Sequence, residues 1–277
     1  MRLSTLRLTT TRTAAARVER NRLALLPFPD VGALLARDSW RELAAAPGEP
    51  LTPAEASTVT EPFTTRLVTF AQVEVNYAAR AKELDMPPPS TPRLLTTPVA
   101  ALAGDRDTLR LTLTPDIRWG VELGIVIGQY TFRIPKERAL GSVAGYTVVN
   151  TFAAIGRPAT VVIGPQLVTA DELPLGARGL TLTAALDGRP RQKANISDLI
   201  FDVATVIEAA SARTSLMPGD LITTGTPAAL STDSLHDGSS TTVAIKGIGE
   251  LHNTVTDRPT PTTGHVRPAS GSTRGRR

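Results

Sequence analysis

The residues that could do metal or acid–base chemistry stand in a few short segments. Glu122 lies inside the apolar, β-branched segment 121–127, which predicts a buried strand. Residues two apart in a strand project to the same side, so a carboxylate at position 120 would join Glu122 in an oxygen site for a divalent cation. Gly120 stands there instead, and one carboxylate holds Mg²⁺ poorly. We therefore expect Glu122 to be an inward carboxylate paired with a nearby arginine; Asp116 has the wrong spacing to complete a metal site.

A second acid–base candidate is Glu83, three residues after Arg80. Guanidinium is not deprotonated in proteins, so Arg80 cannot be a general base. Glu83 could be one if burial raised its pKa. The alternative is a plain surface ion pair between the two side chains, worth about a few tenths of a kcal/mol. The sequence leaves both interpretations open.

The elements that must position these residues are mainly strands. Residues 118–151 predict a strand, a turn, a short helix near 135–140 and a second strand from 145. Residues 199–212 carry the apolar stripe of a helix, with Ser197 or Asp198 as its N-cap. The remaining expected elements are one or two short amphipathic helices in 31–46, a strand at 180–186 before the hairpin turn Asp187-Gly188, and a strand at 221–224.

Three motifs carry a resemblance to a known family. The chain reads V-E-L-x-x-V-I-G from Val121, A-G-Y-T-V-x-N from Ala144, and G-T-P from Gly225. Together they resemble the fumarylacetoacetate hydrolase superfamily over roughly residues 65–256. The resemblance implies an α+β, mostly β fold with rolled mixed β-sheets enclosing a pocket, and a homodimer. It also implies a small N-terminal domain and linker at 1–64 and a main domain at 65–256. The composition of residues 257–277, rich in Pro, Thr, Gly, Ser and Arg, predicts a disordered basic tail.

The chain departs from that family at four positions of the expected site. Members normally have Glu at 120, Asp at 151, His at 80 and Lys at 97, whereas this chain has Gly120, Thr151, Arg80 and Thr97. The segment after Thr151 is also shorter than the family's lid. We therefore expect no metal and an enlarged, neutral cavity. The site residues that the resemblance carries over are Arg80, Glu83 and Glu122 as catalytic groups, and Tyr77, Thr97, Asn150, Thr151 and Thr226 as substrate-binding groups.

Composition limits the partners. The chain has 277 residues, of which 41% are hydrophobic, and it has no cysteine, which excludes disulfides and thiolate chemistry. Its net charge of +4 comes from basic residues near the two ends, and only 4% of residues are aromatic, so no base-stacking platform is expected. No apolar run is long enough to span a bilayer, and no secretory signal is present. We expect a cytoplasmic protein with a small-molecule substrate and no nucleic-acid or membrane partner.

Three functional hypotheses follow. The first is a metal-independent enzyme, without a cofactor, that isomerises or cyclises a small dicarbonyl or polyketide-like molecule or performs related carbon–carbon bond chemistry, as in secondary metabolism. In it Arg80 takes over the electrostatic role of the cation. The second is a non-catalytic homologue that binds a ligand or a partner subunit. The third is a conventional hydrolase, decarboxylase or isomerase of a 2-oxo or β-diketo acid, which would need Mg²⁺ or Mn²⁺ and a further carboxylate.

Overall fold

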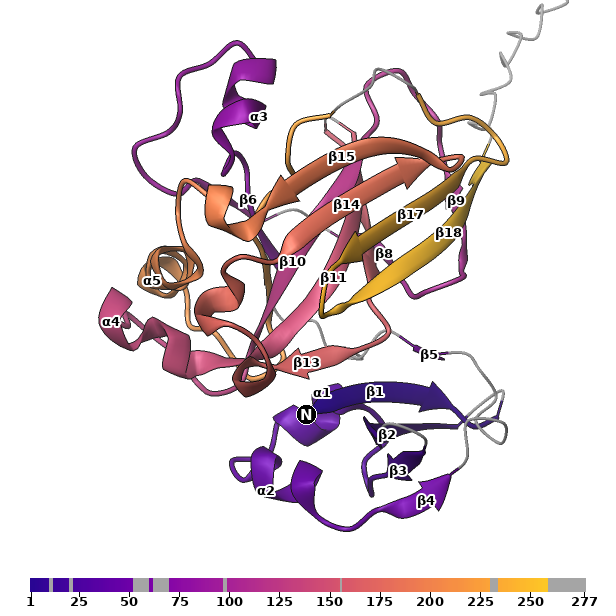
Figure 1. Cartoon of the computed structure of the whole chain (residues 1–277), viewed down its shortest axis with the longest axis vertical. Helices are drawn as coiled ribbons and strands as arrows, with labels where there is room; N and C mark the ends of the chain where they lie inside the picture. The colour runs from indigo at the N-terminus through magenta and orange to yellow at the C-terminus, as the bar shows by residue number, and fades with distance from the viewer. Residues whose placement is uncertain are drawn as a thin grey trace, which may run out of the picture.

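Two β-sheets form the framework of the protein (Figure 1). The computed structural model describes residues 1–9, 12–19, 22–51, 60–61, 70–96, 99–154, 156–229 and 234–258. The larger sheet runs β4-β3-β2-β1-β13-β11-β10-β16-β6-β7 in these residues, with β5 paired to β1 and β12 bridging β11 and β8. Its strands are β1 (Arg2–Arg7), β2 (Thr13–Val18), β3 (Leu23–Leu25), β4 (Glu49–Leu51), β5 (Thr60–Glu61), β6 (Phe70–Val73), β7 (Leu94–Leu95), β8 (Val99–Ala103), β10 (Arg118–Ile127), β11 (Val143–Ala153), β12 (Ala159–Ile163), β13 (Leu167–Thr169) and β16 (Leu221–Thr223).

The smaller sheet packs across β10 and β11 (Figure 1). Its order is β15-β14-β17-β18-β9, and its strands are β14 (Thr181–Leu186), β15 (Arg189–Asn195), β17 (Ser240–Ile245), β18 (Gly249–Asp257) and β9 (Thr108–Leu111). Asp187 and Gly188 join β14 to β15 with φ of 50° and 76°, the left-handed backbone that a two-residue hairpin requires. The expected strand and hairpin at 180–188 are confirmed.

Strands β10 and β11 are buried on both faces, which explains why they are almost continuously apolar. On one face Trp119, Val121 and Leu123 of β10 join a core shared with the smaller sheet. On the opposite face Val126 packs with residues of the N-terminal segment, among them Leu34 and Trp40. Because side chains alternate along a strand, Glu122 lies on the same side of β10 as Gly120 and Val126.

The N-terminal segment is joined to the larger sheet. Leu3 of β1 pairs with Leu167 of β13 in an antiparallel ladder. Two helices follow, α1 (Val31–Leu35) and α2 (Trp40–Ala45), as the amphipathic pattern predicts. The division into domains at 64 and 256 stays a prediction. The tail proposed for 257–277 lies almost wholly outside the described residues.

The long helix starts later than expected. Helix α5 spans Val203–Arg213, and its N-cap is Asp202, whose carboxylate accepts from Thr205 N at 2.8 Å. The prediction of Ser197 or Asp198 as the cap was wrong. Leu199 has an extended backbone, with φ of −61° and ψ of 132°, and the next two residues bind Asn76 instead: Asn76 O accepts from Ile200 N at 2.8 Å and Asn76 Oδ1 accepts from Phe201 N at 2.8 Å.

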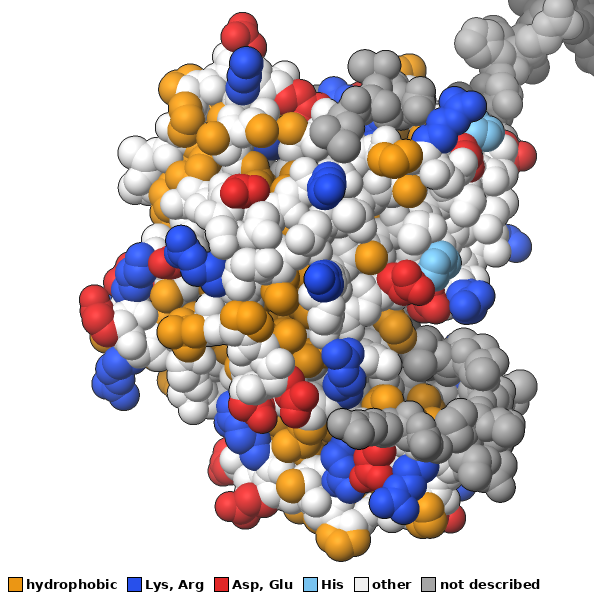
Figure 2. Space-filling view, viewed as in Figure 1, with side chains coloured by type: hydrophobic (Ala, Val, Ile, Leu, Met, Phe, Trp, Pro, Cys, Tyr) orange, Lys and Arg blue, Asp and Glu red, His pale blue; other side chains and the backbone are white. Residues whose placement is uncertain are grey.

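Two shorter helices complete the main body. They are α3 (Ala78–Glu83) and α4 (Lys136–Ala139), and α4 packs beside α5. None of the helices in the described ranges has the length and apolar character needed to cross a membrane. Figure 2 shows Lys and Arg side chains scattered among Asp and Glu side chains on one face of the molecule.

Candidate functional site

Glu122 is a buried carboxylate at the point where four strands meet. It lies on β10 and is 1% exposed. Its Oε1 accepts from Gln72 Nε2 of β6, and its Oε2 accepts from Gly225 N at 2.9 Å, just beyond β16. The hydroxyls of Thr151 and Thr223 also lie toward the carboxylate, without the geometry of a formal hydrogen bond. The prediction of an arginine partner for Glu122 was wrong. In the described structure the carboxylate is hydrogen-bonded to the side-chain amide of Gln72 and to the backbone N–H of Gly225.

Burial raises the pKa of Glu122 above its ordinary value near 4.5. Removal from water penalises the charged form and is the largest effect. The polar groups of Thr223, Thr151, Gln72 and Gly225 act in the opposite direction, but they do not outweigh it. Glu122 is therefore suited to holding a proton above the pH at which an exposed glutamate has lost it.

The free energy of unfolding should fall as pH rises above the ordinary pKa of glutamate. The folded protein keeps the Glu122 proton at pH values where the unfolded chain has released it, so this stabilisation is full at low pH and is lost as pH rises through the folded pKa. Glu122→Gln should flatten this part of the profile, because an amide does not titrate. The variant should still fold, because Gln72 can rotate its own amide and accept a hydrogen bond from the new one. Urea unfolding between pH 5 and 9 measures it. The exposed substitution Glu137→Gln is the control, and an unchanged profile in Glu122→Gln would refute the assignment.

Gln192 fills the space beside Gly120. A Cβ at position 120 would overlap Thr226 Oγ1 and lie 2.5 Å from Gln192 Oε1. Gln192 is 3% exposed, and its amide makes three hydrogen bonds: Oε1 accepts from Val121 N at 3.0 Å, and Nε2 donates to Thr226 Oγ1 at 2.9 Å and Pro227 O at 2.7 Å. The expectation of an enlarged cavity was wrong here, because a neutral amide occupies the place of the absent side chain.

Sequence reasoning missed Gln192. Its signal was a polar residue at an inward position of β15, opposite the buried Ala184 of β14. A buried amide must find several hydrogen-bond partners, so such a residue fixes whatever surrounds it. Here it fixes the turn that carries Thr226 and, two residues earlier in the chain, Thr224 after β16. That turn also supplies the Gly225 N–H bound to Glu122.

Arg80 and Glu83 form an ion pair at the end of α3. Arg80 Nη1 lies 2.5 Å from Glu83 Oε2, with the side chains 15% and 35% exposed. Ala229 N donates to the same carboxylate oxygen at 3.4 Å. Arg80 therefore points at Glu83 and orients it. The prediction that Arg80 binds a substrate directly stays untested. In this structure Arg80 instead holds the Glu83 carboxylate in position.

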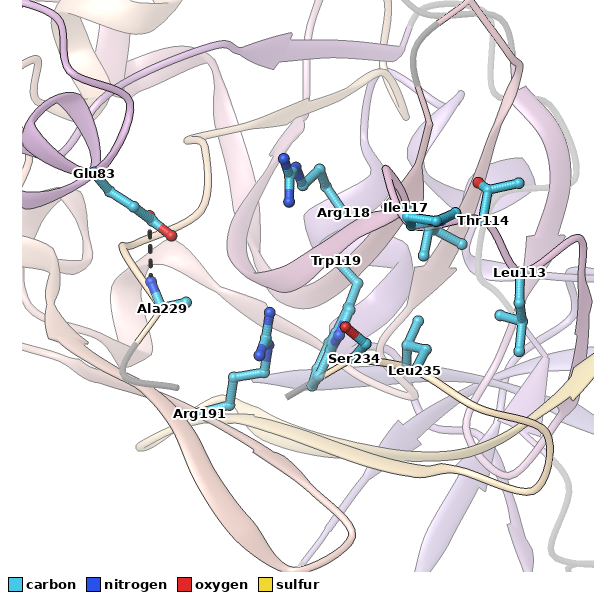
Figure 3. A pocket seen from close by; sticks show the side chains of 11 residues that line it. Glu83, Leu113, Thr114, Ile117, Arg118, Trp119, Arg191, Ala229, Ser234 and Leu235 are labelled. Carbon is cyan, nitrogen blue, oxygen red and sulfur yellow. Dashed lines mark hydrogen bonds between the residues drawn. The ribbon is translucent and has the colours of Figure 1, made fainter. Parts of the chain in front are cut away.

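A cavity of about 450 Å³ opens beside these groups (Figure 3). The cavity lies against the buried site, because two of its lining residues are neighbours of the site in the sequence. Trp119 precedes Gly120 on β10, and Arg191 precedes Gln192 on β15. The Arg191 guanidinium lies 5.4 Å above the Trp119 ring, and that ring stacks on Phe152 at 6.0 Å. The lining residues are Glu83, Leu113, Thr114, Pro115, Ile117, Arg118, Trp119, Arg191, Ala229, Ser234 and Leu235.

The other expected substrate-binding residues are dispersed. Tyr77 is 2% exposed, and its hydroxyl has no hydrogen-bond partner among the residues that the structure describes. Burial, with a smaller contribution from Glu122, raises the pKa of Tyr77. Asn150 is buried, and within the described ranges its amide has no hydrogen-bond partner; it faces the side of the sheet opposite to Thr151 and Glu122. Thr97 lies outside the described residues.

The donor set does not fit a divalent cation. No group of three His, Asp or Glu side chains gathers anywhere in the part of the chain that the structure describes. In the described structure Glu122 has no second carboxylate beside it, and its two hydrogen-bonding neighbours, Gln72 Nε2 and Gly225 N, turn N–H donors toward the oxygens that a cation would need. Asp116 does not complete such a group.

Comparison with known proteins shows the family to which the chain belongs. Residues 69–256 match the model of the fumarylacetoacetate (FAA) hydrolase C-terminal family, so the chain belongs to the fumarylacetoacetate hydrolase family. The Mycobacterium tuberculosis protein Rv2993c is 32% identical over 200 residues, 67% of this chain and 74% of that protein.

Solved structures agree with this assignment. A Mycobacterium smegmatis protein described as HpcE superposes with a TM-score of 0.82 at 26% identity, covering 94% of this chain and 100% of that one. Maleylpyruvate hydrolase from Sphingobium, in complex with manganese(II) and pyruvate, gives a TM-score of 0.74 at 25% identity and covers 93% of this chain and 99% of that one. The family resemblance and the mostly β, α+β fold are confirmed.

Proposed function

We propose that the protein is a metal-independent enzyme that isomerises or cyclises a small dicarbonyl acid by moving a proton. The observation that carries the proposal is the filled position beside Gly120: Gln192 and Thr226 occupy the space where a second carboxylate would meet Glu122. The family likeness supports an enzyme, since its solved relatives include proteins named as hydrolases and isomerases. Enolate stabilisation must then come from the chain's own cations and hydrogen-bond donors.

Glu83 is the group placed to move the proton. Its carboxylate lies on the cavity wall, held by Arg80 and Ala229 N. It would take a proton from the carbon between two carbonyl groups, and the negative charge would pass to a carbonyl oxygen facing Arg118 and Arg191. The protonated Glu83 would return the proton to another carbon of the same conjugated system. The substrate is isomerised, and Glu83 ends as a carboxylate again.

Removing metal should change neither activity nor thermal stability. Protein treated with EDTA would be assayed with a panel of acylpyruvates and β-diketo acids, following the ultraviolet absorbance of their enols, before and after addition of Mg²⁺ or Mn²⁺. A cation that binds the folded state must raise the Tm, so we expect no shift. The Sphingobium maleylpyruvate hydrolase, which was crystallised with manganese(II), is the positive control.

Two results would overturn the proposal. Stoichiometric metal with a raised Tm would restore the conventional metal-dependent hydrolase, decarboxylase or isomerase. Ligand binding without turnover of any compound in the panel would favour the non-catalytic homologue.

A further inference from the structure

Leu175 is the most exposed of the large hydrophobic side chains that the structure describes, at 81%. It stands in the turn between β13 and β14, where Gly176, Ala177 and Gly179 have φ of 63°, 57° and 84°. Ala177 is fully buried, and its N donates to Pro174 O at 2.7 Å. An alanine rarely adopts this left-handed backbone, so its burial and its hydrogen bond hold the turn in shape. The fold thus specifies the position of a leucine that it leaves in contact with solvent.

A pocket of about 190 Å³ adjoins Leu175 and has it as one of its lining residues. Leu140, Leu199 and Val203 supply much of the apolar wall. A cavity of about 150 Å³ is large enough to hold a benzene ring, so this pocket has room for one leucine side chain. A single exposed leucine is common on a protein surface, but here the projecting side chain and a hole that fits it lie side by side. Such a surface is complementary to itself, as a contact between two identical chains related by a two-fold axis requires.

The same side of the molecule carries further exposed apolar side chains, and Figure 2 shows hydrophobic groups gathered beside α4 and α5. The segment before α4 runs along α5: Thr131 pairs with Leu216 just after the end of α5, and Lys136 Nζ lies 3.1 Å from Asp202 Oδ2 at its start. Tyrosine, phenylalanine and methionine are enriched in protein interfaces. A contact centred on Leu175 can therefore extend along α5. Of the seven large hydrophobic residues exposed in the described ranges, the four that flank α4 and α5 are Leu175, Tyr130, Phe132 and Met217.

Charges of both signs border the pocket. Arg178 lines it and is exposed, and the exposed Asp198 follows the lining residue Ser197. In a two-fold contact the arginine of each copy meets a surface of the other copy that carries a carboxylate. Opposite charges at the rim of an interface favour the matching orientation over others.

We propose that this surface is the contact between two copies of the chain. In the dimer, Leu175 of each copy fills the other copy's pocket against Leu140, Leu199 and Val203, and Arg178 of each copy lies near the carboxylate at the other copy's pocket rim. Each copy thereby removes from water the apolar side chains that the other exposes along α5. The proposal does not depend on the proposed reaction, because no substrate takes part in the contact.

Two substitutions test the two halves of the contact. Leu175→Asp places a charge where the pocket is apolar, and Ser197→Trp blocks the pocket with a bulky ring; both positions are exposed, so the variants should fold. Each change occurs twice in a two-fold dimer. We therefore expect the dissociation constant, measured by sedimentation equilibrium over a wide range of protein concentration, to rise at least about 100-fold in either variant. Leu84→Asp, at an exposed leucine outside this surface, is the matched control and should leave the dimer unchanged.

Cross-linking tests the geometry of the contact directly. Because the chain has no cysteine, introduced thiols report it without background. Proteins carrying Leu175→Cys or Ser197→Cys would be prepared separately, mixed to exchange subunits and treated with a short bifunctional maleimide. We expect mass spectrometry to find position 175 of one copy joined to position 197 of the other, whereas Leu84→Cys mixed with Ser197→Cys should give no such product.

A wild-type protein that stays monomeric at every concentration would overturn the proposal. A dimer that survives both Leu175→Asp and Ser197→Trp, or that gives no link between positions 175 and 197, would overturn it as well, because its contact would lie on another face. A dimer that meets these tests, in a protein that turns over none of the dicarbonyl acids, would count against the proposed reaction alone.

Discussion

Replacing Glu83 by glutamine is expected to lower kcat by about 10²–10⁴-fold with little change in KM. Glutamine keeps the shape of the side chain, and its amide oxygen can still accept from Arg80 and from Ala229 N, so the cavity wall should be preserved. What is lost is the ability to take and return a proton. Steady-state kinetics on the best dicarbonyl substrate would measure both constants.

The chain offers a close control for this substitution. Glu74 is also a partly exposed carboxylate paired with an arginine, with Arg93 Nη1 at 3.0 Å from Glu74 Oε2, and it does not line the cavity. Glu74→Gln should leave kcat unchanged. If Glu83→Gln kept full kcat, the proton would have to move through another group, and the buried Glu122 would be the next to test.

Sequence patterns predicted the strands better than the contacts of their polar residues. The hairpin at Asp187-Gly188 and the strands around Glu122 follow from local preferences, which act through neighbouring residues. The start of α5 does not, because Asn76, far away in sequence, binds residues 200 and 201. The partner of Glu122 was missed for the same reason: Gln72 reaches it through the pairing of β6 with β16 and of β16 with β10.

A family pattern did not predict that Gln192 fills the space beside Gly120. A missing carboxylate at Gly120 suggests an empty space, yet close packing rarely leaves one. The side chain that fills it comes from the other sheet and engages all its hydrogen-bonding groups except one lone pair. The glycine at position 120 therefore does not leave a cavity. It replaces a carboxylate in the site by the buried amide of Gln192.

The N-terminal segment packs against the larger sheet. Its apolar residues pack against Val126 of β10, with Leu34, Leu35 and Trp40 among them. The contact that anchors the segment is Trp40 of α2, which is 2% exposed and donates from Nε1 to Gly128 O at 3.1 Å, one residue beyond the end of β10.

Substituting Trp40 by alanine is expected to lower the free energy of unfolding by about 3–5 kcal/mol. The change removes the largest side chain of this interface, its hydrogen bond to Gly128 and the ring on which Arg41 lies at 4.4 Å. Urea unfolding followed by circular dichroism would measure it. Trp40→Phe keeps most of the apolar contact and loses the indole N–H, so it should cost less than alanine, leaving Gly128 O unpaired at about 1–3 kcal/mol. A loss below about 1 kcal/mol in Trp40→Ala would mean that β1 pairing with β13, rather than Trp40, holds the segment in place.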